Sequence, residues 1–368
     1  MDSKPTILIL ILADLGTDNR CRKLASSLSR RGYRPIVLAD RPVRPPGAAW
    51  DGIAVRFLTR RSHYQGFFRA LAEYLWRATP ILLADRSAAW IVEDGAPLLW
   101  ASLLGRLRGK RVVYDARDLL LQTPAIRARP SRRLFWTAWL GLGEALCGPL
   151  LTVSPGLERV YRAAHPRRAV HLLPNAPELK EPPPARVLGA GPVRLLYQGA
   201  LRPDSGLQDL LPALALSPRY ELDVYGDGSA AAALAESAAR LGLSDRVRFH
   251  GAVPFEALAR PLAESHIGVH PLIPSCANFE YAWSNKLFDS LHALSPMLLS
   301  DTEAHRDFLA REPVGVIPAS RAPGDVLHAL ETLCAGYDGY VAACRAARER
   351  WHWEAFAGCL DAALAGNT

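Results

Sequence analysis

The sequence has no apolar run of about 20 residues, the length that a membrane-spanning helix needs. Its six cysteines are scattered without a C-x-x-C pair, which disfavours a disulfide framework or a zinc site and suits reduced thiols in the cytoplasm. The ten histidines also lack metal-ligand spacing. The opening residues, MDSKPTILILILAD, lack a small-residue cleavage site and suit a buried strand better than a signal peptide. We therefore expect a cytoplasmic protein without a catalytic metal, whose membrane contact would be peripheral and on the cytoplasmic face.

Hydrophobic residues and arginine are abundant instead. The 368 residues are 49% hydrophobic, which is enough for two compact domains with full cores. The formal net charge of +8 favours acidic partners, namely nucleotides, nucleic acid or an anionic membrane surface. No DNA- or RNA-binding signature accompanies this charge, so we expect no nucleic-acid partner.

Apolar runs alternate with helical patterns in both halves of the chain. The first half predicts strands at 6–13, 34–38, 88–92, 111–115 and 150–153, and helices at 19–31, 96–108 and 134–147. The second half predicts strands at 193–197, 220–225, 247–250 and 267–270, and helices at 206–215, 230–241, 255–263, about 324–350, and a short one around 351–364. Such alternation indicates βαβ units and parallel sheets. The predicted fold class is α/β, with two Rossmann-like, doubly wound domains facing across a cleft, where ligands bind at the strand ends.

A segment rich in proline and glycine separates the two halves. Residues 179–192, LKEPPPARVLGAGP, show no period and read as a linker. We therefore expect an N-terminal domain over residues 1–178 and a C-terminal domain over residues 193–350.

The most informative segment is NFEYAWSNKLFDSLHALSPMLLSD, residues 278–301. It reads as a polar loop, an amphipathic helix that begins near Ser284 and Asn285, and a buried strand. A helix N-terminus suits a diphosphate, and Lys286 adds a cation in the first turn. Asp289 lies one turn (~5.4 Å) further on, where a carboxylate can bind two adjacent sugar hydroxyls. This spacing suits a nucleoside diphosphate, although an ordinary surface helix with a Lys and an Asp is the alternative.

The order of motifs along most of the chain resembles the GT-B glycosyltransferases, specifically the retaining family 4 enzymes of glycosyltransferase group 1. VVYDARDLL is similar to their strand that ends in Asp-Ala-His-Asp, and VRLLYQGALRPDSGLQDLL to the opening of their donor domain. SNKLFDSLHALSPMLLSD is similar to their Pro-Asn-Lys-Leu-Phe-Glu signature. The resemblance implies a C-terminal domain that binds the nucleotide sugar, an N-terminal domain that binds the acceptor, and a last helix, 351–368, that packs back on the N-terminal domain.

The resemblance assigns several residues to the donor diphosphate. Gly199 ends the first strand of the donor domain, in a strand–Gly–loop–helix unit that lets the backbone approach a phosphate. Family members carry cations at the positions of Ala200 and Ser205, so Arg202 is left as the diphosphate clamp, or else as a solvated loop arginine.

Further donor residues follow from the same resemblance. Gly226 and Gly228 are expected to turn beneath the nucleobase or diphosphate, or to form a plain strand-to-helix turn. Ser284, Asn285 and Lys286 are expected at the diphosphate. Asp289 takes the place of the second motif glutamate, which would bind the ribose, but its side chain is one methylene shorter.

The catalytic residues are where the chain departs from the family. Arg117 stands at the place of the family histidine; it cannot be a general base but can stabilise a leaving diphosphate, or it can instead pair with Asp115 or Asp118. The first motif glutamate falls at Tyr281, and the adjacent Glu280 is the second catalytic candidate.

Residues for the donor sugar or the acceptor are assigned by position. They lie in the first loop, at the ends of two N-domain strands and in the motif loop, and are Gly16, Thr17, Glu93, Asp94, Asp118 and Tyr281.

The predicted function is sugar transfer from a nucleoside-diphosphate sugar, UDP- or GDP-linked, to a hydroxyl of a sugar, lipid-linked or small-molecule acceptor. No cofactor is expected. The first alternative is a catalytically weak or inactive GT-B-like protein that serves as a binding or partner subunit. A nicotinamide-dependent oxidoreductase is disfavoured because the first loop lacks G-x-G-x-x-G. A GT-B epimerase or phosphorylase stays open.

Two N-domain stretches combine basic and aromatic residues. They are HYQGFFRALAEYLWR, residues 63–77, and RARPSRRLFWTAWLGLGEALC, residues 127–147. Such composition suits the headgroup region of a membrane. The alternative is a core-facing helix with a solvated basic end.

Overall fold

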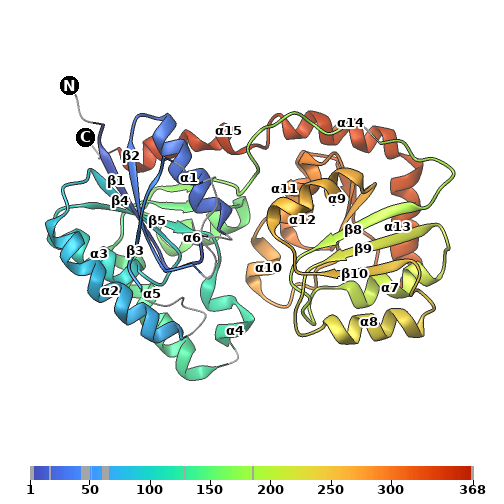
Figure 1. Cartoon of the computed structure of the whole chain (residues 1–368), viewed down its shortest axis with the longest axis horizontal. Helices are drawn as coiled ribbons and strands as arrows, with labels where there is room; N and C mark the ends of the chain where they lie inside the picture. Colours follow the sequence, from blue (N-terminus) through green and yellow to red (C-terminus); the bar gives the residue numbers. More distant parts are fainter. Residues whose placement is uncertain are drawn as a thin grey trace. The chain divides into compact units, whose positions relative to one another are not determined.

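The computed structural model describes residues 4–15, 18–42, 50, 52–59, 66–127, 129–184 and 186–365. The chain divides into two compact units (Figure 1). The first contains the residues up to Pro174 together with the segment from Trp353, and the second is Asn175–His352. By this division the segment 179–192 belongs to the second unit.

The first unit contains a parallel sheet with strand order β3-β2-β1-β4-β5-β6-β7. Its described strands are β1 Thr6–Ile11, β2 Arg34–Ala39, β3 Ala54–Phe57, β4 Ala89–Glu93, β5 Arg111–Ala116, β6 Leu150–Thr152 and β7 Val170–Leu172. Its α-helices are α1 Asn19–Arg30, α2 Phe67–Ala84, α3 Leu98–Leu107, α4 Pro124–Arg127, α5 Pro130–Leu146, α6 Pro155–Ala164, α15 Trp353–Ala357 and α16 Cys359–Leu364. The strand order reverses between β1 and β4, which makes the carboxyl ends of these strands a switch point where ligands bind in such sheets.

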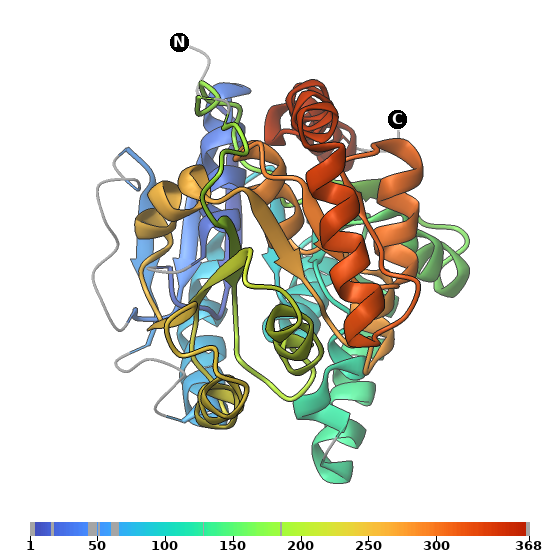
Figure 2. The same ribbon diagram turned by 90° about the vertical axis from the view of Figure 1, so that its right-hand side faces the viewer.

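The second unit repeats this design with strand order β10-β9-β8-β11-β12-β13. Its described strands are β8 Val193–Gln198, β9 Tyr220–Tyr225, β10 Val247–Gly251, β11 Ile267–His270, β12 Met297–Leu299 and β13 Gly315–Val316. Its α-helices are α7 Leu207–Ala215, α8 Ala231–Arg240, α9 Ala259–Glu264, α10 Ala277–Tyr281, α11 Asn285–His292, α12 Glu303–Arg311, α13 Pro323–Ala335 and α14 Tyr337–Arg348. Helix α13, orange-red in Figure 2, packs against α7 and the last two strands. The switch point of this sheet lies between β8 and β11.

Buried aliphatic strands explain both cores. In β1, Ile7, Ile9 and Ile11 are buried, and they pack in one cluster with α1, α15 and α16. Strands that are buried on both faces are typical of parallel sheets covered by helices. The α/β fold class and the two Rossmann-like sheets are therefore confirmed; the cleft between the domains stays a prediction.

The C-terminal segment completes the first unit. The Trp353 indole Nε1 donates a hydrogen bond to Ser27 Oγ at 2.7 Å, and Glu354 Oε1 accepts one from the same hydroxyl at 2.7 Å. Trp353 is fully buried beside Leu360, so this segment contributes core rather than surface.

Three local predictions are wrong in detail. The single helix expected over about 324–350 is two helices, because Gly336 ends α13 and glycine is a poor helix former. The helix expected over 255–263 begins as a 3₁₀ turn, Phe255–Leu258, before α9. The loop expected from residue 278 contains the short helix α10. The helix start near Ser284 and Asn285 is confirmed, since α11 begins at Asn285.

Candidate functional site

Gly199 follows β8 directly and brings the backbone against Lys286. Its φ is +133°, a conformation that residues with a Cβ rarely adopt. A Cβ at this position would lie 2.4 Å from Lys286 Nζ and 2.5 Å from Lys286 Cε. Glycine is therefore required here both for its backbone conformation and for the space that the lysine side chain fills.

A second glycine turn is hydrogen-bonded to this loop. Gly226 has φ +145°, and its Cβ would lie 1.9 Å from the Gly199 carbonyl oxygen. The Leu201 N–H donates to the Asp227 carbonyl oxygen at 3.0 Å, and the Leu201 carbonyl oxygen accepts from the Ala230 N–H at 2.9 Å. Gly226 and Gly228 thus support the Gly199 loop from the neighbouring strand; their contact with a base or diphosphate stays a prediction.

Lys286 lies in the first turn of α11, whose N-terminal end adjoins the Gly199 loop. Its Nζ is 4.5 Å from the centre of the Tyr197 ring and 3.3 Å from the Tyr197 hydroxyl. Burial, together with the nearby Arg202 charge, lowers the pKa of Lys286 to about 8. Ser284, the N-cap residue, makes no side-chain hydrogen bond to the described residues of α11. Backbone N–H groups and an ammonium group are therefore available at one place for an anion.

Two groups hold Arg202 in position, Asp204 of its own loop and the Phe279 ring of α10. Its Nε donates to Asp204 Oδ1 at 2.9 Å, and its guanidinium carbon lies 4.7 Å from the centre of the Phe279 ring. Asp204 Oδ2 in turn accepts from the Ser275 hydroxyl at 2.8 Å. The Arg202 side chain is 43% exposed, so it is oriented yet accessible to a ligand. This geometry favours an oriented guanidinium over a freely solvated one.

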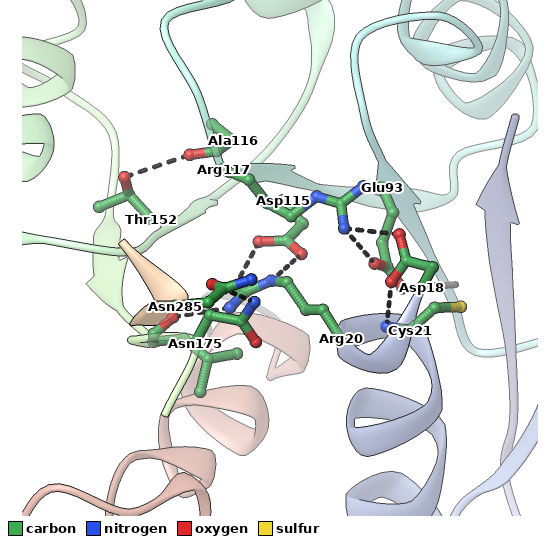
Figure 3. A network of polar contacts seen from close by, with 11 residues as sticks. Asp18, Arg20, Cys21, Glu93, Asp115, Ala116, Arg117, Thr152, Asn175 and Asn285 are labelled. Atoms are coloured by element: carbon green, nitrogen blue, oxygen red, sulfur yellow. Dashed lines mark hydrogen bonds and ion pairs between the residues drawn. The ribbon is translucent and has the colours of Figure 1, made fainter. Parts of the chain in front are cut away.

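Two other residues expected to bind the nucleotide sugar, Asp289 and Asn285, already make hydrogen bonds within the second unit. Asp289 Oδ2 accepts from Gln198 Nε2 at 2.8 Å, which ties α11 to the end of β8. Asn285 Oδ1 accepts from Asn175 Nδ2 at 2.7 Å (Figure 3). One Asp289 oxygen therefore has a protein partner already, and ribose binding by this residue stays a prediction.

Glu280 performs a structural task. Its carboxylate accepts from the Glu303 N–H at 2.8 Å, at the start of α12, and lies 3.5 Å from an Arg306 guanidinium nitrogen. A carboxylate at a helix N-terminus satisfies a free N–H group and the positive end of the helix dipole. Tyr281 is the last residue of α10, next to it in the chain.

The first unit gathers charged side chains at the carboxyl ends of β1, β4 and β5 (Figure 3). Arg20 binds Asp115 through two hydrogen bonds of 2.7 Å, and both side chains are buried. Arg117 binds Asp18 at 2.8 Å and lies 3.8 Å from Glu93. Of the two partners that the sequence suggested for Arg117, Asp115 is thus engaged by Arg20. Asp18, which the sequence analysis did not single out, is the partner that the structure shows.

Burial and neighbouring charges shift the pKa values of the acidic residues in this group. Burial raises the pKa of Glu93, and the negative charge of Asp18 adds to the shift. Burial also raises the pKa of Asp94, whose φ of +70° is unusual for a residue with a Cβ and whose Oδ1 accepts from the Gly95 N–H at 2.6 Å. For Asp18 burial is the largest cause and acts in the same direction, but the Arg117 charge and the hydrogen bonds from Cys21 and Arg117 together outweigh it, and the pKa is lowered.

The remaining candidates are placed as follows. Asp118 is exposed, and its carbonyl oxygen accepts from the Tyr161 hydroxyl at 3.1 Å. Gly16 and Thr17 lie outside the described residues. Asp94, described above, has a positive φ, and strained backbone of this kind is often found at functional sites.

Three supporting residues escape sequence reasoning. Asp18, Tyr197 and Phe279 contact Arg117, Lys286 and Arg202 from distant parts of the chain. Only Asp18 carries a local signal, since an aspartate before a helix is a common N-cap, and it does accept from the Cys21 N–H at 2.9 Å.

The described part of the chain contains neither a metal-binding cluster nor a membrane-spanning helix. No group of three or more His, Cys, Asp or Glu side chains there has a metal-binding arrangement. No helix in the described ranges has the length and apolar character needed to cross a membrane.

Comparison with known proteins identifies the fold. The structure is similar to sucrose-phosphate synthase from Thermosynechococcus elongatus, with a TM-score of 0.74, 17% identity, and coverage of 97% of this chain and 98% of that chain. It is similar to HepE of Anabaena bound to UDP-glucose, with a TM-score of 0.73, 14% identity, and coverage of 98% and 99%. It is also similar to WaaG, a glycosyltransferase involved in lipopolysaccharide biosynthesis, with a TM-score of 0.71, 15% identity, and coverage of 98% and 100%.

Comparison of the sequence alone matches only part of the chain. No curated protein matches the sequence. The family model described as glycosyl transferases group 1 matches residues 192–335, which include Gly199, Arg202, Lys286 and Asp289. The chain therefore has the GT-B fold, and its residues 192–335 match the family model of the glycosyl transferases group 1.

Proposed function

We propose that the protein transfers a sugar from a nucleoside-diphosphate sugar to an acceptor hydroxyl. The observation that carries this proposal is the contact between the Gly199 loop and Lys286 at the start of α11. Free backbone N–H groups, one ammonium group and the oriented Arg202 guanidinium together suit a diphosphate. The match of this segment to the glycosyl transferases group 1 family supports the same ligand.

The residues of the site suggest how transfer would proceed. The bond between the anomeric carbon and the diphosphate oxygen breaks, and the electron pair leaves with the nucleoside diphosphate. Lys286 and Arg202 would stabilise the negative charge that develops on the departing phosphate. The acceptor oxygen bonds to the anomeric carbon, and its proton passes to the leaving phosphate. Arg117, which binds Asp18, would act as a fixed cation and not as a base.

Finer features of the proposal rest on the family resemblance. We propose transfer with retention and without a metal, from a UDP- or GDP-linked donor, in cell-surface polysaccharide, glycolipid or natural-product biosynthesis. A UDP-linked donor is favoured by the UDP-glucose in the HepE structure. The acceptor would be a sugar, a lipid-linked sugar or a small molecule, and the enzyme would work in the cytoplasm with peripheral contact to an anionic membrane.

Calorimetric titration with UDP, GDP, ADP and dTDP tests the donor site. We expect one nucleotide to bind, and Lys286→Met to weaken that binding by at least about tenfold, the loss of one charged phosphate contact. Asp289→Ala should weaken it too if the carboxylate contacts the ribose. Lys180→Met is the matched control, because Lys180 is exposed and lies outside the site. Absence of binding by all four nucleotides would refute the donor-site assignment.

Two observations favour the alternative of a nucleotide-binding protein with little or no turnover. Arg117 is engaged by Asp18, and Glu280 is engaged at the start of α12. Release of free nucleotide from a bound nucleotide sugar, with and without candidate acceptors, separates the two functions. Binding without release supports the alternative. Release that Arg117→Ala abolishes, while nucleotide affinity is kept, supports catalysis.

A further inference from the structure

The outer surfaces of α2 and α5 expose large apolar side chains. On α2 these are Phe68, Trp76 and Leu83, which are 47%, 76% and 45% exposed. On α5 they are Leu134 and Leu142, which are 75% and 50% exposed. The exposed residues recur at seven- and eight-residue spacing, so each set follows one side of its helix.

These side chains are not a displaced core face, because each helix also has a buried side. Tyr74 and Leu82 of α2 are fully buried, as is most of Trp136 and Leu140 of α5. Each of these helices is therefore apolar both on its core side and on its solvent side, where large apolar side chains are exposed. Such exposed apolar surface marks an interaction site.

Aromatic contacts join the two helices into one surface. The Phe68 and Phe135 rings lie 5.6 Å apart, and the Phe67 and Trp136 rings 5.8 Å apart, centre to centre. Figure 1 shows both helices on the same side of the first sheet. We call this surface the α2–α5 face; its apolar part is Phe68, Trp76, Leu83, Leu134 and Leu142.

The charge of the α2–α5 face is positive. Arg69 is exposed beside Phe68, and Arg129, Arg132 and Arg133 are exposed at the start of α5. The acidic residues of the two helices are Glu73 and Glu144. Each is engaged, Glu73 by Arg77 at 3.0 Å and Glu144 by His165 Nε2 at 3.1 Å. The arginines at this face are therefore not neutralised by acids of the same helices.

We propose that the α2–α5 face docks on the surface of an anionic membrane. Tryptophan, phenylalanine and leucine at the apolar part would enter the boundary between headgroups and acyl chains, while the arginines contact lipid phosphates. A protein partner would need acidic groups opposite four exposed arginines and also a matched cavity for Trp76, whereas anionic lipid supplies both charge and apolar surface without specific shape. Membrane docking would bring the proposed transferase to a lipid-linked acceptor. The role of such an acceptor rests on the proposed function, whereas membrane contact itself does not.

Co-sedimentation of the full chain with vesicles tests the proposal. We expect binding to vesicles of phosphatidylcholine mixed with phosphatidylglycerol, and weak binding to phosphatidylcholine alone. Replacing Arg129, Arg132 and Arg133 by Gln should lower partitioning on the order of 100-fold, and salt should have a similar effect. Trp76→Ser combined with Leu134→Ser and Leu142→Ser should lower it by at least about tenfold.

Matched controls keep the result interpretable. Leu216 and Leu241 are exposed leucines of the second unit, 58% and 36% exposed, and their change to Ser should leave vesicle binding unchanged. All replaced residues are exposed, so thermal unfolding and nucleotide affinity should be unchanged in every variant. If the wild-type protein binds no nucleotide but still binds vesicles, the donor-site proposal is refuted and the membrane-surface proposal is not.

Three outcomes would overturn the inference. The first is that the wild-type chain does not bind anionic vesicles. The second is that the α2–α5 variants bind them as well as the Leu216→Ser and Leu241→Ser variants. The third is that the wild-type protein self-associates through this face and the serine variants become monomeric, which would make the face an interface between copies of the chain.

Discussion

The ammonium group of Lys286 lies over the ring of Tyr197, 4.5 Å from its centre, beside Gly199. Because burial lowers the pKa of Lys286 to about 8, the group is charged at neutral pH and loses its proton in mildly alkaline solution. We expect nucleotide affinity to fall about tenfold for each pH unit above 8, since only the charged form attracts the diphosphate. Calorimetric titration across this range measures the effect.

The matched variant for the pH experiment is Lys286→Arg. A guanidinium keeps its charge throughout, so its nucleotide affinity should vary little with pH even if it is lower overall. An identical pH dependence in both proteins would show that another group controls binding. Because the unfolded lysine has the higher pKa, 10.5, the free energy of unfolding should also rise between about pH 8 and 10.5 in the wild type alone.

Replacement of Gly199 by Ala should disable the donor site. The new methyl group would meet the Lys286 side chain, and the φ of +133° is strained for alanine, at a cost of about 1–3 kcal/mol. We expect a lower free energy of unfolding and a loss of nucleotide binding, as measured by denaturation and calorimetry. Gly189→Ala is the control, because nothing lies within 4 Å of its Cβ position. Equal effects of the two changes would contradict the role given to Gly199.

The Phe279 ring should matter through Arg202. Phe279→Ala removes the surface on which the guanidinium rests, at a loss of about 0.5–1 kcal/mol for an exposed cation–π pair. Nucleotide affinity should therefore fall several-fold, and Phe279→Tyr should restore it. In an Arg202→Ala background, Phe279→Ala should have no further effect on affinity. Additive losses from the two changes would show that Phe279 acts independently of Arg202.

The buried pair Arg20–Asp115 should be essential for stability. Asp115→Ala leaves the guanidinium buried without its carboxylate, which costs about 3–5 kcal/mol. Glu236→Ala breaks the exposed pair Arg240–Glu236, 67% and 70% exposed, and should change stability by less than about 0.5 kcal/mol. Urea denaturation compares the two. A small effect of Asp115→Ala would mean that water reaches Arg20 and replaces the lost partner.

Glu93 should make the protein less stable as the pH rises. Its folded pKa lies above the ordinary value of 4.5, so between these two values the folded chain binds a proton that the unfolded chain has lost. The free energy of unfolding should fall over this interval, and Glu93→Gln should reduce that slope. Denaturation at about pH 5 and about pH 8 measures the difference. A slope that is equal in wild type and variant would place the proton on another group, such as Asp94.

Periodic patterns made most of the fold predictable. Buried aliphatic runs such as Ile7–Ile11 and the amphipathic spacing of residues 285–292 are local signals, and the structure contains both elements. The contacts that shape the candidate site are not local. Arg20 and Asp115 are 95 residues apart, and Gln198 and Asp289 are 91 apart, so no pattern in either segment indicates its partner.

Glu280 is a second residue whose contact with a distant segment could not be predicted from the sequence. Its position beside a motif residue suggested chemistry, whereas its partner is the N–H of Glu303, which sequence alone does not place nearby.

The return of the chain at Trp353 has a consequence for biosynthesis. Trp353, Leu360 and Ala363 belong to the same hydrophobic core as Ile9 and Leu24, so that core is incomplete until residue 363 has left the ribosome. The second unit, by contrast, is continuous in sequence from Asn175 to His352. We therefore expect the second unit to fold as soon as it is synthesised, and the first unit to complete its core only after α15 and α16 have followed.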